Sequence, residues 1–512
     1  MTDTAPETPA NETGGAPPDM SPETFRDLGH HLVDRIADVL ASVAERPAAP
    51  DLTPAAARAL VGGDGLPEAG APAAALLDRA TDTLLAGCRI NGHPRSWGYI
   101  IGSPAPLGML ADLLASAINP NVAAWSSAPA ATEIEAQTVR WIAEFLGYPT
   151  DCGGLLVSGG NMANFIGVLA ARRARLDWDV RREGLAAGAA RPCLYASRET
   201  HTWVEKAADL FGLGTEAIRY VATDPDLRMV PAALETAIAA DRAAGARPFL
   251  VIGTAGTVST GAVDPLPKLA EIAHRHGLWF HVDGAYGAPA VATPEAPADL
   301  KGLRAADSLA MDAHKWLYAP LEAGCALVRD RALLRDTFSY RPPYYHHAVD
   351  DGEVIHYYEY GPQNSRCFRA LKVWLALAHV GRAGYVAAIS RDIARARHMH
   401  AHLAAADEIE AVSCNLSITT FRYVPRDLDP AEPAAATYLN DLNGALLTAI
   451  QAGGDAFISN AVVDGRFLLR ACITNFRTRE EDVAALAGIV RRAGHDLDRR
   501  FRPRGLGADG GR

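Results

Sequence analysis

A carboxylate and an amine each end an apolar stretch in the middle of this chain. Asp283 ends the run Phe-His-Val-Asp at residues 280–283, and Lys315 follows His314 in the run Asp-Ala-His-Lys-Trp at residues 312–316. Both runs are typical of buried strands, and ligands of open α/β sheets bind at the carboxyl ends of the strands. Burial favours the neutral form of a lysine, and a neutral amine can form a Schiff base.

An acid opposite such a lysine can keep a pyridine nitrogen protonated. These two groups are the minimum that pyridoxal 5'-phosphate (PLP) requires of a protein. Taken alone, Lys315 is more often a solvated loop residue, and Asp283 could cap a turn. Their combination, in this order and with His314 before the lysine, favours the cofactor interpretation.

Three other segments have residues suited to the same site. Gly160 and Asn161 precede an expected helix at residues 162–175, where backbone N–H groups can bind a phosphate, although a Gly-Gly pair could be only a tight turn. His201 follows another expected strand and could stack on a planar cofactor, transfer protons, or be an ordinary loop residue. Residues 338–360 are rich in tyrosine and histidine, which is typical of a mobile lid or of a dimer-contact loop.

The elements that must position these residues alternate between strand and helix. This alternation predicts an α/β fold with a mostly parallel sheet and helices on both faces. Beyond about residue 390 the pattern changes to that of a smaller α+β domain. The predicted organisation is a disordered tail (1–20), an N-terminal helical dimerisation segment (21–90), a large cofactor-binding domain (91–385), a small C-terminal domain (386–500) and a flexible tail (501–512). Strands are expected near residues 155–157, 193–196, 218–221, 249–252, 279–282, 308–311 and 325–328.

Composition limits the class of protein and its compartment. The chain has 512 residues, 49% of them apolar and 21% charged, with a formal net charge of −11. This charge argues against a nucleic-acid partner. Seven scattered cysteines without a CxxC pair suit a reducing cytosol and predict no metal site. We find no signal peptide in residues 1–20 and no apolar run of about 18 residues, so we expect a cytoplasmic protein without a membrane partner.

Several motifs together resemble those of the PLP-dependent group II amino acid decarboxylases, whose best-known branch is aromatic-L-amino-acid decarboxylase. The resemblance covers roughly residues 21–495. The strongest motifs are His-Val-Asp-Gly-Ala-Tyr at 281–286, Asp-Ala-His-Lys-Trp at 312–316 and Ser-Arg-Cys-Phe-Arg-Ala-Leu-Lys at 365–372, supported by Pro-Ala-Ala-Thr-Glu-Ile-Glu at 129–135 and Leu-Arg-Ala-Cys-Ile-Thr-Asn at 469–475.

The resemblance implies fold type I of the PLP enzymes, a homodimer, and an active site at the subunit interface. It also implies a role for each matching residue. Lys315 is similar to the Schiff-base lysine, Asp283 to the partner of the pyridine nitrogen, Ala285 to the small residue beneath the ring, His201 to the imidazole stacked above it, Gly160 and Asn161 to the phosphate loop, His314 to a histidine close to cofactor and substrate carboxylate, and Tyr344 to the lid tyrosine that returns a proton.

Three features depart from the family pattern. The phosphate loop reads Ser-Gly-Gly-Asn-Met-Ala-Asn at residues 158–164, where the animal branch has hydroxyl residues, so backbone N–H groups must do more there. Asp312 stands where some members have asparagine, and a carboxylate near a phosphate is unfavourable unless it faces away, so we assign it no ligand role. Cys367 separates a familiar pair of arginines, and we attach no consequence to it.

The sequence alone does not determine which amino acid is the substrate. Trp97, Tyr99, Ile100 and Trp125 suggest an aromatic-lined pocket and an aromatic amino acid, whereas Arg95 could meet the distal carboxylate of glutamate or aspartate, and an aliphatic substrate such as valine also fits. The same fold supports an oxygen-using aldehyde synthase, which tends to replace the lid tyrosine or the stacked histidine; Tyr344 and His201 are both present, so we rank it second. An aminotransferase or a cofactor-free binding protein has less support.

Overall fold

The computed structural model describes residues 19–63, 65–340 and 354–507. Its largest element is a seven-stranded sheet in the order β1-β7-β6-β5-β4-β2-β3. Strands β2 to β6 run parallel, and β7 is antiparallel to both of its neighbours. This confirms the prediction of a mostly parallel sheet. The strands are β1 Gly153–Val157, β2 Pro192–Ser197, β3 Ile218–Val221, β4 Arg247–Thr254, β5 Trp279–Asp283, β6 Ser308–Asp312 and β7 Gly324–Val328.

Both faces of this sheet are covered by helices, which explains the continuous apolar runs of its central strands. Alternate residues of the strands contribute to two apolar layers. One layer lies beneath α5 (Pro129–Phe145) and α10 (Leu266–Arg275), and the other beneath α6 (Gly160–Arg175) and α8 (Trp203–Leu210). Further helices at the edges are α7 Val180–Glu183, α9 Pro231–Ala243 and α12 Arg331–Phe338.

The C-terminal part has its own antiparallel sheet in the order β10-β11-β9-β8. Its core lies between this sheet and two helices, α14 (Pro433–Gly453) and α15 (Glu480–Phe501). This matches the smaller α+β domain expected from the sequence. The strands are β8 Ile409–Asn415, β9 Ile418–Tyr423, β10 Ser459–Val463 and β11 Arg466–Cys472.

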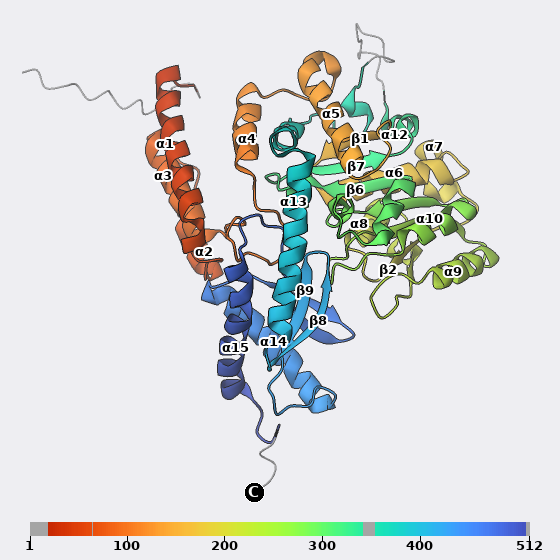
Figure 1. The fold of residues 1–512 in the computed structure, drawn as a ribbon. Helices are drawn as coiled ribbons and strands as arrows, with labels where there is room; N and C mark the ends of the chain where they lie inside the picture. The colour runs from red at the N-terminus through yellow and green to blue at the C-terminus, as the bar shows by residue number, and fades with distance from the viewer. Residues whose placement is uncertain (1–18, 64, 341–353, 508–512) are drawn as a thin grey trace, which may run out of the picture.

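One long helix, α13 (Ala370–Ala404), runs from the large sheet to the small one (Figure 1). It contacts α5 and the apolar α4 (Pro106–Ile118) as well as α15, β8 and β9. Gly381 interrupts it with non-helical angles (φ 69°, ψ 166°), and the domain boundary predicted at residues 385–386 falls just beyond this kink. By length and composition alone α13 is apolar enough to cross a membrane, but its packing is that of a helix shared by two cores.

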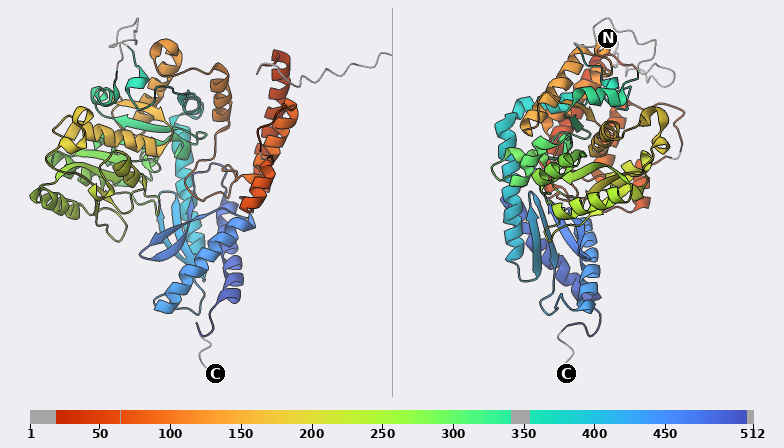
Figure 2. Two further views of the ribbon diagram at one scale, coloured as in Figure 1. Left: turned by 180° about the vertical axis from the view of Figure 1, so that it is seen from behind. Right: turned by 90° about the vertical axis from the view of Figure 1, so that its right-hand side faces the viewer.

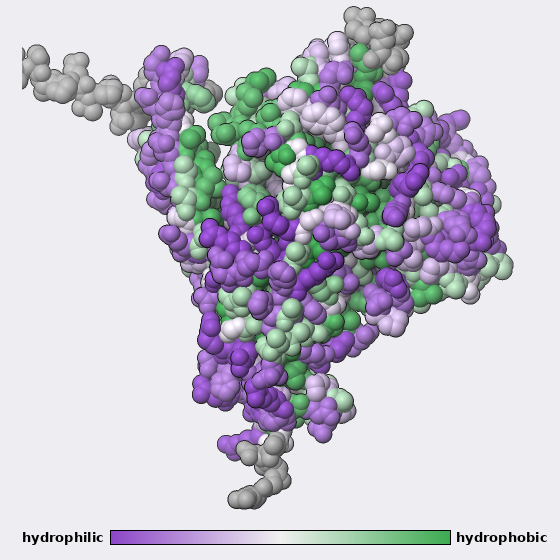
Figure 3. Space-filling view, in the orientation of Figure 1, coloured by the Kyte–Doolittle hydropathy of each residue, from purple (hydrophilic) through white to green (hydrophobic). Residues whose placement is uncertain are grey.

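Three N-terminal helices stand at one side of the molecule (Figure 1, Figure 2). They are α1 Pro22–Ser42, α2 Pro54–Val61 and α3 Ala73–Gly87. Ser21 caps α1, because its side chain accepts a hydrogen bond from the Thr24 N–H. None of these helices buries a residue, and apolar side chains lie exposed on them and on α4, where Figure 3 shows hydrophobic residues gathered.

Candidate active site

A cavity of about 240 Å³ lies where β4, β5 and β6 end. It is therefore at the carboxyl edge of the parallel strands, as expected for an open α/β sheet. Most of the residues predicted for the site meet there. Its lining consists of Ile100, Gly160, Asn161, Asn164, His201, Trp203, Thr254, Gly256, Val258, Asp283, Ala285, Tyr286, Asp312, His314 and Lys315.

Asp283 is held at the end of β5 by two donors. Its Oδ2 accepts a hydrogen bond of 2.7 Å from the Trp203 indole N–H, and its Oδ1 accepts one of 3.1 Å from the Ala285 N–H. Bonds from fixed donors stabilise the ionised carboxylate and set its orientation. Trp203 lies on α8 and is fully buried, so the direction of the acid is determined by the protein rather than by solvent.

A buried histidine lies behind this acid on the same face of β5. The imidazole of His281 lies 2.7 Å from Ser308 Oγ on one side and 2.7 Å from Asn164 Oδ1 on the other. Burial lowers the pKa of His281 to about 4. The ring is therefore neutral at pH 7.

Lys315 lies on a single helical turn, α11 (Ala313–Trp316), directly after β6. Its Nζ is 2.9 Å from Oδ2 of Asp312, while Oδ1 of Asp312 is buried and without a partner in the described part of the chain. Asp312 thus faces the lysine. It belongs to the wall of the cavity, although the sequence analysis gave it no role. The same Asp312 oxygen lies close to the start of α6, because a Cβ on Gly160 would be 2.7 Å from it. The pairing therefore holds the Lys315 amine beside the first turn of α6.

The two predicted histidines both line the cavity. The Nδ1 atom of His314 accepts a hydrogen bond of 3.1 Å from the Ala323 N–H, and burial lowers its pKa. His201 lies at the mouth with its ring accessible to solvent, and its Nδ1 accepts from the Trp203 N–H at 3.2 Å. Partial loss of water lowers the pKa of His201 as well. In both rings Nδ1 is an acceptor, which leaves the other ring nitrogen to carry the proton.

The start of α6 provides room and N–H groups for an anion. Gly159 has φ 146°, and a side chain on Gly160 would also press on the Ala285 Cβ at 3.3 Å. The first N–H groups of a helix bind anions. Across the cavity, Thr254 Oγ1 is buried without a partner among the described residues. A cavity lined by an acid, a lysine, the start of a helix and an unpaired hydroxyl fits PLP.

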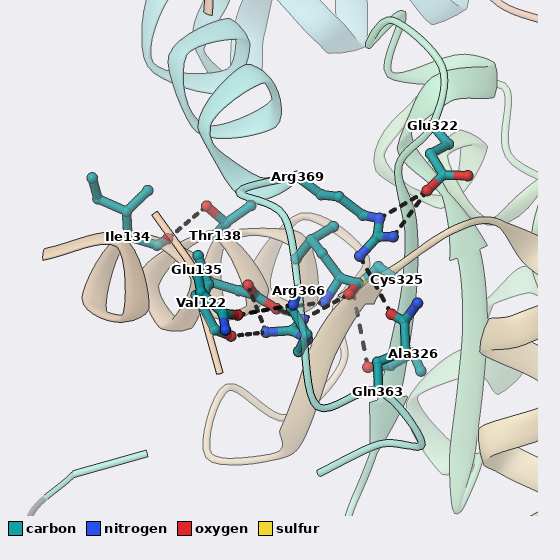
Figure 4. A network of polar contacts seen from close by, with 12 residues as sticks. Val122, Ile134, Glu135, Thr138, Glu322, Cys325, Ala326, Gln363, Arg366 and Arg369 are labelled. Carbon is teal, nitrogen blue, oxygen red and sulfur yellow. Dashed lines mark hydrogen bonds and ion pairs between the residues drawn. The ribbon is translucent and has the colours of Figure 1, made fainter. Parts of the chain in front are cut away.

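A buried ion pair fixes the strand that leads into this phosphate cradle (Figure 4). Glu135 and Arg366 are buried and joined at 2.5 Å. Glu135 accepts from the Leu156 N–H at 2.8 Å, and Arg366 donates to the Leu156 carbonyl at 2.8 Å. Both backbone groups of β1 just before Gly159 are therefore held by side chains. Cys367 is exposed and does not enter the network, although it lies next to Arg366 in the sequence.

The predicted substrate wall is only partly at the cavity. Ile100 lines it, but Trp97 is fully buried elsewhere and donates from Nε1 to Thr478 Oγ1 at 3.1 Å. Trp125 donates to Glu133 at 3.0 Å outside the lining. Tyr99 is 58% exposed, with φ 61° and its ring centroid 5.7 Å from that of Phe457.

Two further residues were singled out from the sequence, and the structure describes one of them. Arg95 pairs with Asp482 at 2.9 Å, so its charge is engaged within the fold. Tyr344 lies outside the described residues, and its role stays a prediction. The structure adds Trp203, Thr254 and Asn164, which the sequence reasoning did not place in the site. Thr254 could have been found by the strand-end rule that identified Asp283, because it also ends a strand.

Comparisons with known proteins agree with this geometry. Residues 58–424 match the pyridoxal-dependent decarboxylase conserved domain. An aromatic-L-amino-acid decarboxylase of Bacillus atrophaeus is 34% identical over 470 residues, covering 91% of this chain and 94% of the relative. A tyrosine decarboxylase of Arabidopsis thaliana is 31% identical, covering 92% and 87%.

A solved structure of Oryza sativa TDC with PLP and tryptamine superposes with a TM-score of 0.86 at 30% identity, covering 94% of this chain and 100% of that one. The shared fold is type I of the PLP enzymes, as the sequence motifs predicted. With its acid, lysine and cradle on one cavity, the chain belongs to the family of pyridoxal-dependent amino acid decarboxylases, which are PLP-dependent lyases.

Proposed function

We propose that this protein decarboxylates an aromatic L-amino acid to the corresponding amine and CO2. The observation that carries the proposal is the placement of Asp283, Lys315 and Gly160 in the lining of one cavity. The aromatic preference is supported by the aromatic-L-amino-acid and tyrosine decarboxylases among the relatives, and by Ile100 as an apolar wall. Arg95 gives no support to an acidic substrate, because it is paired with Asp482.

Each residue has a task that follows from its surroundings. Bound PLP supplies an electron sink for the electron pair left when CO2 departs. Asp283, oriented by its two fixed donors, would hold a proton on the pyridine nitrogen. Lys315 would be the amine that binds the cofactor covalently. The N–H groups at the start of α6 would hold the phosphate.

Neutral His201 and His314 are the candidates for handling protons and the substrate carboxylate. In both rings the nitrogen that is not bonded to the backbone carries a proton, so it can donate a hydrogen bond to the substrate. Since His314 precedes Lys315 and its Nε2 lies 3.7 Å from Asp312 Oδ2, we assign the contact with the departing carboxylate to His314. Tyr344 is predicted to return the proton to Cα, and we assign His201, at the mouth, a supporting part in that step.

We also propose that the protein acts as a homodimer in the cytosol. The second copy would cover the exposed apolar side chains of the N-terminal helices and α4, which have no partner surface in the described chain. They include Phe25, Val33, Ile36, Leu110, Leu113, Leu114 and Ile118. Light scattering should give the mass of a dimer, and a Leu113→Asp/Leu114→Asp variant should shift it to the monomer. The free cysteines support a reducing compartment.

The test of the activity is a product assay on purified protein loaded with PLP. L-tyrosine, L-tryptophan, L-phenylalanine, L-glutamate and L-valine are supplied separately, and CO2, amine, ammonia and peroxide are measured together. We expect CO2 and amine in equal amounts from an aromatic substrate, without peroxide. Because a phenylacetaldehyde synthase of Petunia hybrida is 29% identical, the decisive contrary result is peroxide and ammonia in place of amine. Lys315→Ala is the control and should be inactive.

A further inference from the structure

The residues that follow Lys315 turn away from the cavity into a buried polar cluster. Trp316 and Tyr318 are almost inaccessible to solvent. The Trp316 indole N–H donates to Asp392 Oδ2 at 3.0 Å, and the Tyr318 hydroxyl donates to the same oxygen at 2.8 Å. Asp392 lies on α13 beyond the Gly381 kink and is itself fully buried. A carboxylate of the domain-connecting helix therefore binds the chain immediately after the reactive lysine.

A second residue of α13 binds the same stretch of chain. The Tyr385 hydroxyl donates to the Leu317 carbonyl at 3.1 Å, and its ring stacks with that of Tyr318 at 6.2 Å and 10°. Tyr318 has φ 54°, a left-handed conformation that a tyrosine rarely adopts. Such a conformation persists where surrounding contacts impose it. The path of the chain after Lys315 is thus imposed by α13.

The chain that follows Asp283 also contacts this polar cluster. Tyr286, three residues after Asp283, lines the cavity and stacks on Trp316 with centroids 5.0 Å apart and planes at 15°. Its hydroxyl is 2.7 Å from Ser417 Oγ of the small domain. The chain segments that present the acid and the amine are therefore joined by one stacked ring pair behind the cavity.

We propose that Asp392 is a positioning residue that sets the place of Lys315 relative to Asp283. It lies outside the cavity lining and acts through Trp316 and Tyr318. Packing alone does not account for a carboxyl group there, because burying one is costly and an aliphatic side chain would fill the space. The two hydrogen bonds to Oδ2 are what a leucine cannot supply. The inference rests on the proposed role of Lys315.

The experiment compares Tyr318→Phe, Asp392→Asn and Asp392→Leu with a matched control in the small domain. There the Tyr438 hydroxyl donates to the buried Asp498 at 2.8 Å, so Tyr438→Phe removes the same kind of bond far from the cavity. The readouts are the dissociation constant for PLP, followed by visible absorbance, and the melting temperature of the protein without PLP. Borohydride reduction and peptide mapping of the wild type identify the lysine that PLP modifies.

We expect Asp392→Leu to weaken PLP binding about tenfold or more, because small displacements of reacting groups are costly. Tyr318→Phe should weaken it several-fold, and Asp392→Asn should stay close to wild type, since its carbonyl oxygen can accept both bonds. Tyr438→Phe should lower the melting temperature as much as Tyr318→Phe without changing PLP binding.

Two results would overturn the inference. One is unchanged PLP binding in Tyr318→Phe. If Asp392→Leu does not fold, the result for Tyr318→Phe is sufficient to accept or reject the inference. The other is an equal loss of binding in Tyr438→Phe, which would reduce Asp392 to a general contribution to stability. PLP attached to a lysine other than Lys315 in the wild type would instead refute the proposed function, and with it this inference, whatever the variants do.

Discussion

Replacing Trp203 by phenylalanine removes the donor that orients the acid of the site. The indole N–H lies 2.7 Å from Asp283 Oδ2, and both side chains are buried. A hydrogen bond to a charged group contributes about 1.5–3 kcal/mol, which is roughly 10- to 150-fold in a binding constant. The Ala285 N–H still holds Oδ1, so part of the orientation survives. We therefore expect the lower end, about tenfold weaker PLP binding.

The assay is a titration of the protein without cofactor, with PLP binding followed by visible absorbance and stability by urea unfolding. Trp374→Phe is the control, because its indole N–H donates at 2.7 Å to the neutral side chain of Gln137 on the outside of α5. It should leave PLP binding within about twofold of wild type. If Trp203→Phe also binds PLP within that margin, the orientation of Asp283 does not depend on this bond and the reasoning fails.

Three further changes test other parts of the structure. The pKa of His281 is about 4 in the fold and about 6.5 when unfolded, so the unfolded chain takes up the proton first on acidification. The contribution of His281 to stability, taken as the difference in urea unfolding free energy between wild type and His281→Asn, should be constant above pH 6.5 and fall by about 3 kcal/mol towards pH 4; a difference that does not change with pH would contradict this. Arg366→Met leaves Glu135 buried without its ionic partner and should lower the unfolding free energy by about 3–5 kcal/mol. Adding Glu135→Gln should restore part of this loss. A loss below about 1 kcal/mol would show that the charge of Glu135 is not buried. Asp312→Asn removes a carboxylate from beside the start of α6 and should tighten PLP binding about fivefold, whereas weaker binding would mean that the pairing of Asp312 with Lys315 matters more.

Residues at strand ends were the predictable part of the site. Asp283 and Lys315 follow apolar runs, and the topology of an open sheet brings such positions to one edge. The sheet could be predicted because its strands are buried on both faces and therefore appear in the sequence as continuous apolar runs. The antiparallel direction of β7 follows from the connection after β6, residues 313–323, which is too short for a parallel crossover.

The wall residues could not be placed in this way. Trp97 packs against the small domain, where its backbone N–H donates a hydrogen bond of 2.7 Å to the Phe457 carbonyl. This contact joins residues far apart in the sequence, so no local pattern indicates it. Asp312 was given no ligand role from the sequence, and only the structure shows that its Oδ2 lies 2.9 Å from Lys315 Nζ. The donor to Asp283 was also missed, since a tryptophan at the start of a helix is more often part of the core.

The pairing of β1 has a consequence for how the protein is made. Within the described residues β1 pairs with β7 alone, so residues 153–157 reach their partner only after residues 324–328 have been synthesised. At translation rates of roughly 5–20 residues per second, the delay is roughly 10 to 30 s. During that time the strand before Gly159 has both edges open, and unpaired edges of apolar strands promote aggregation. The start of α6 is thus translated early but takes up its final contacts late, when Gly324 packs against Gly159.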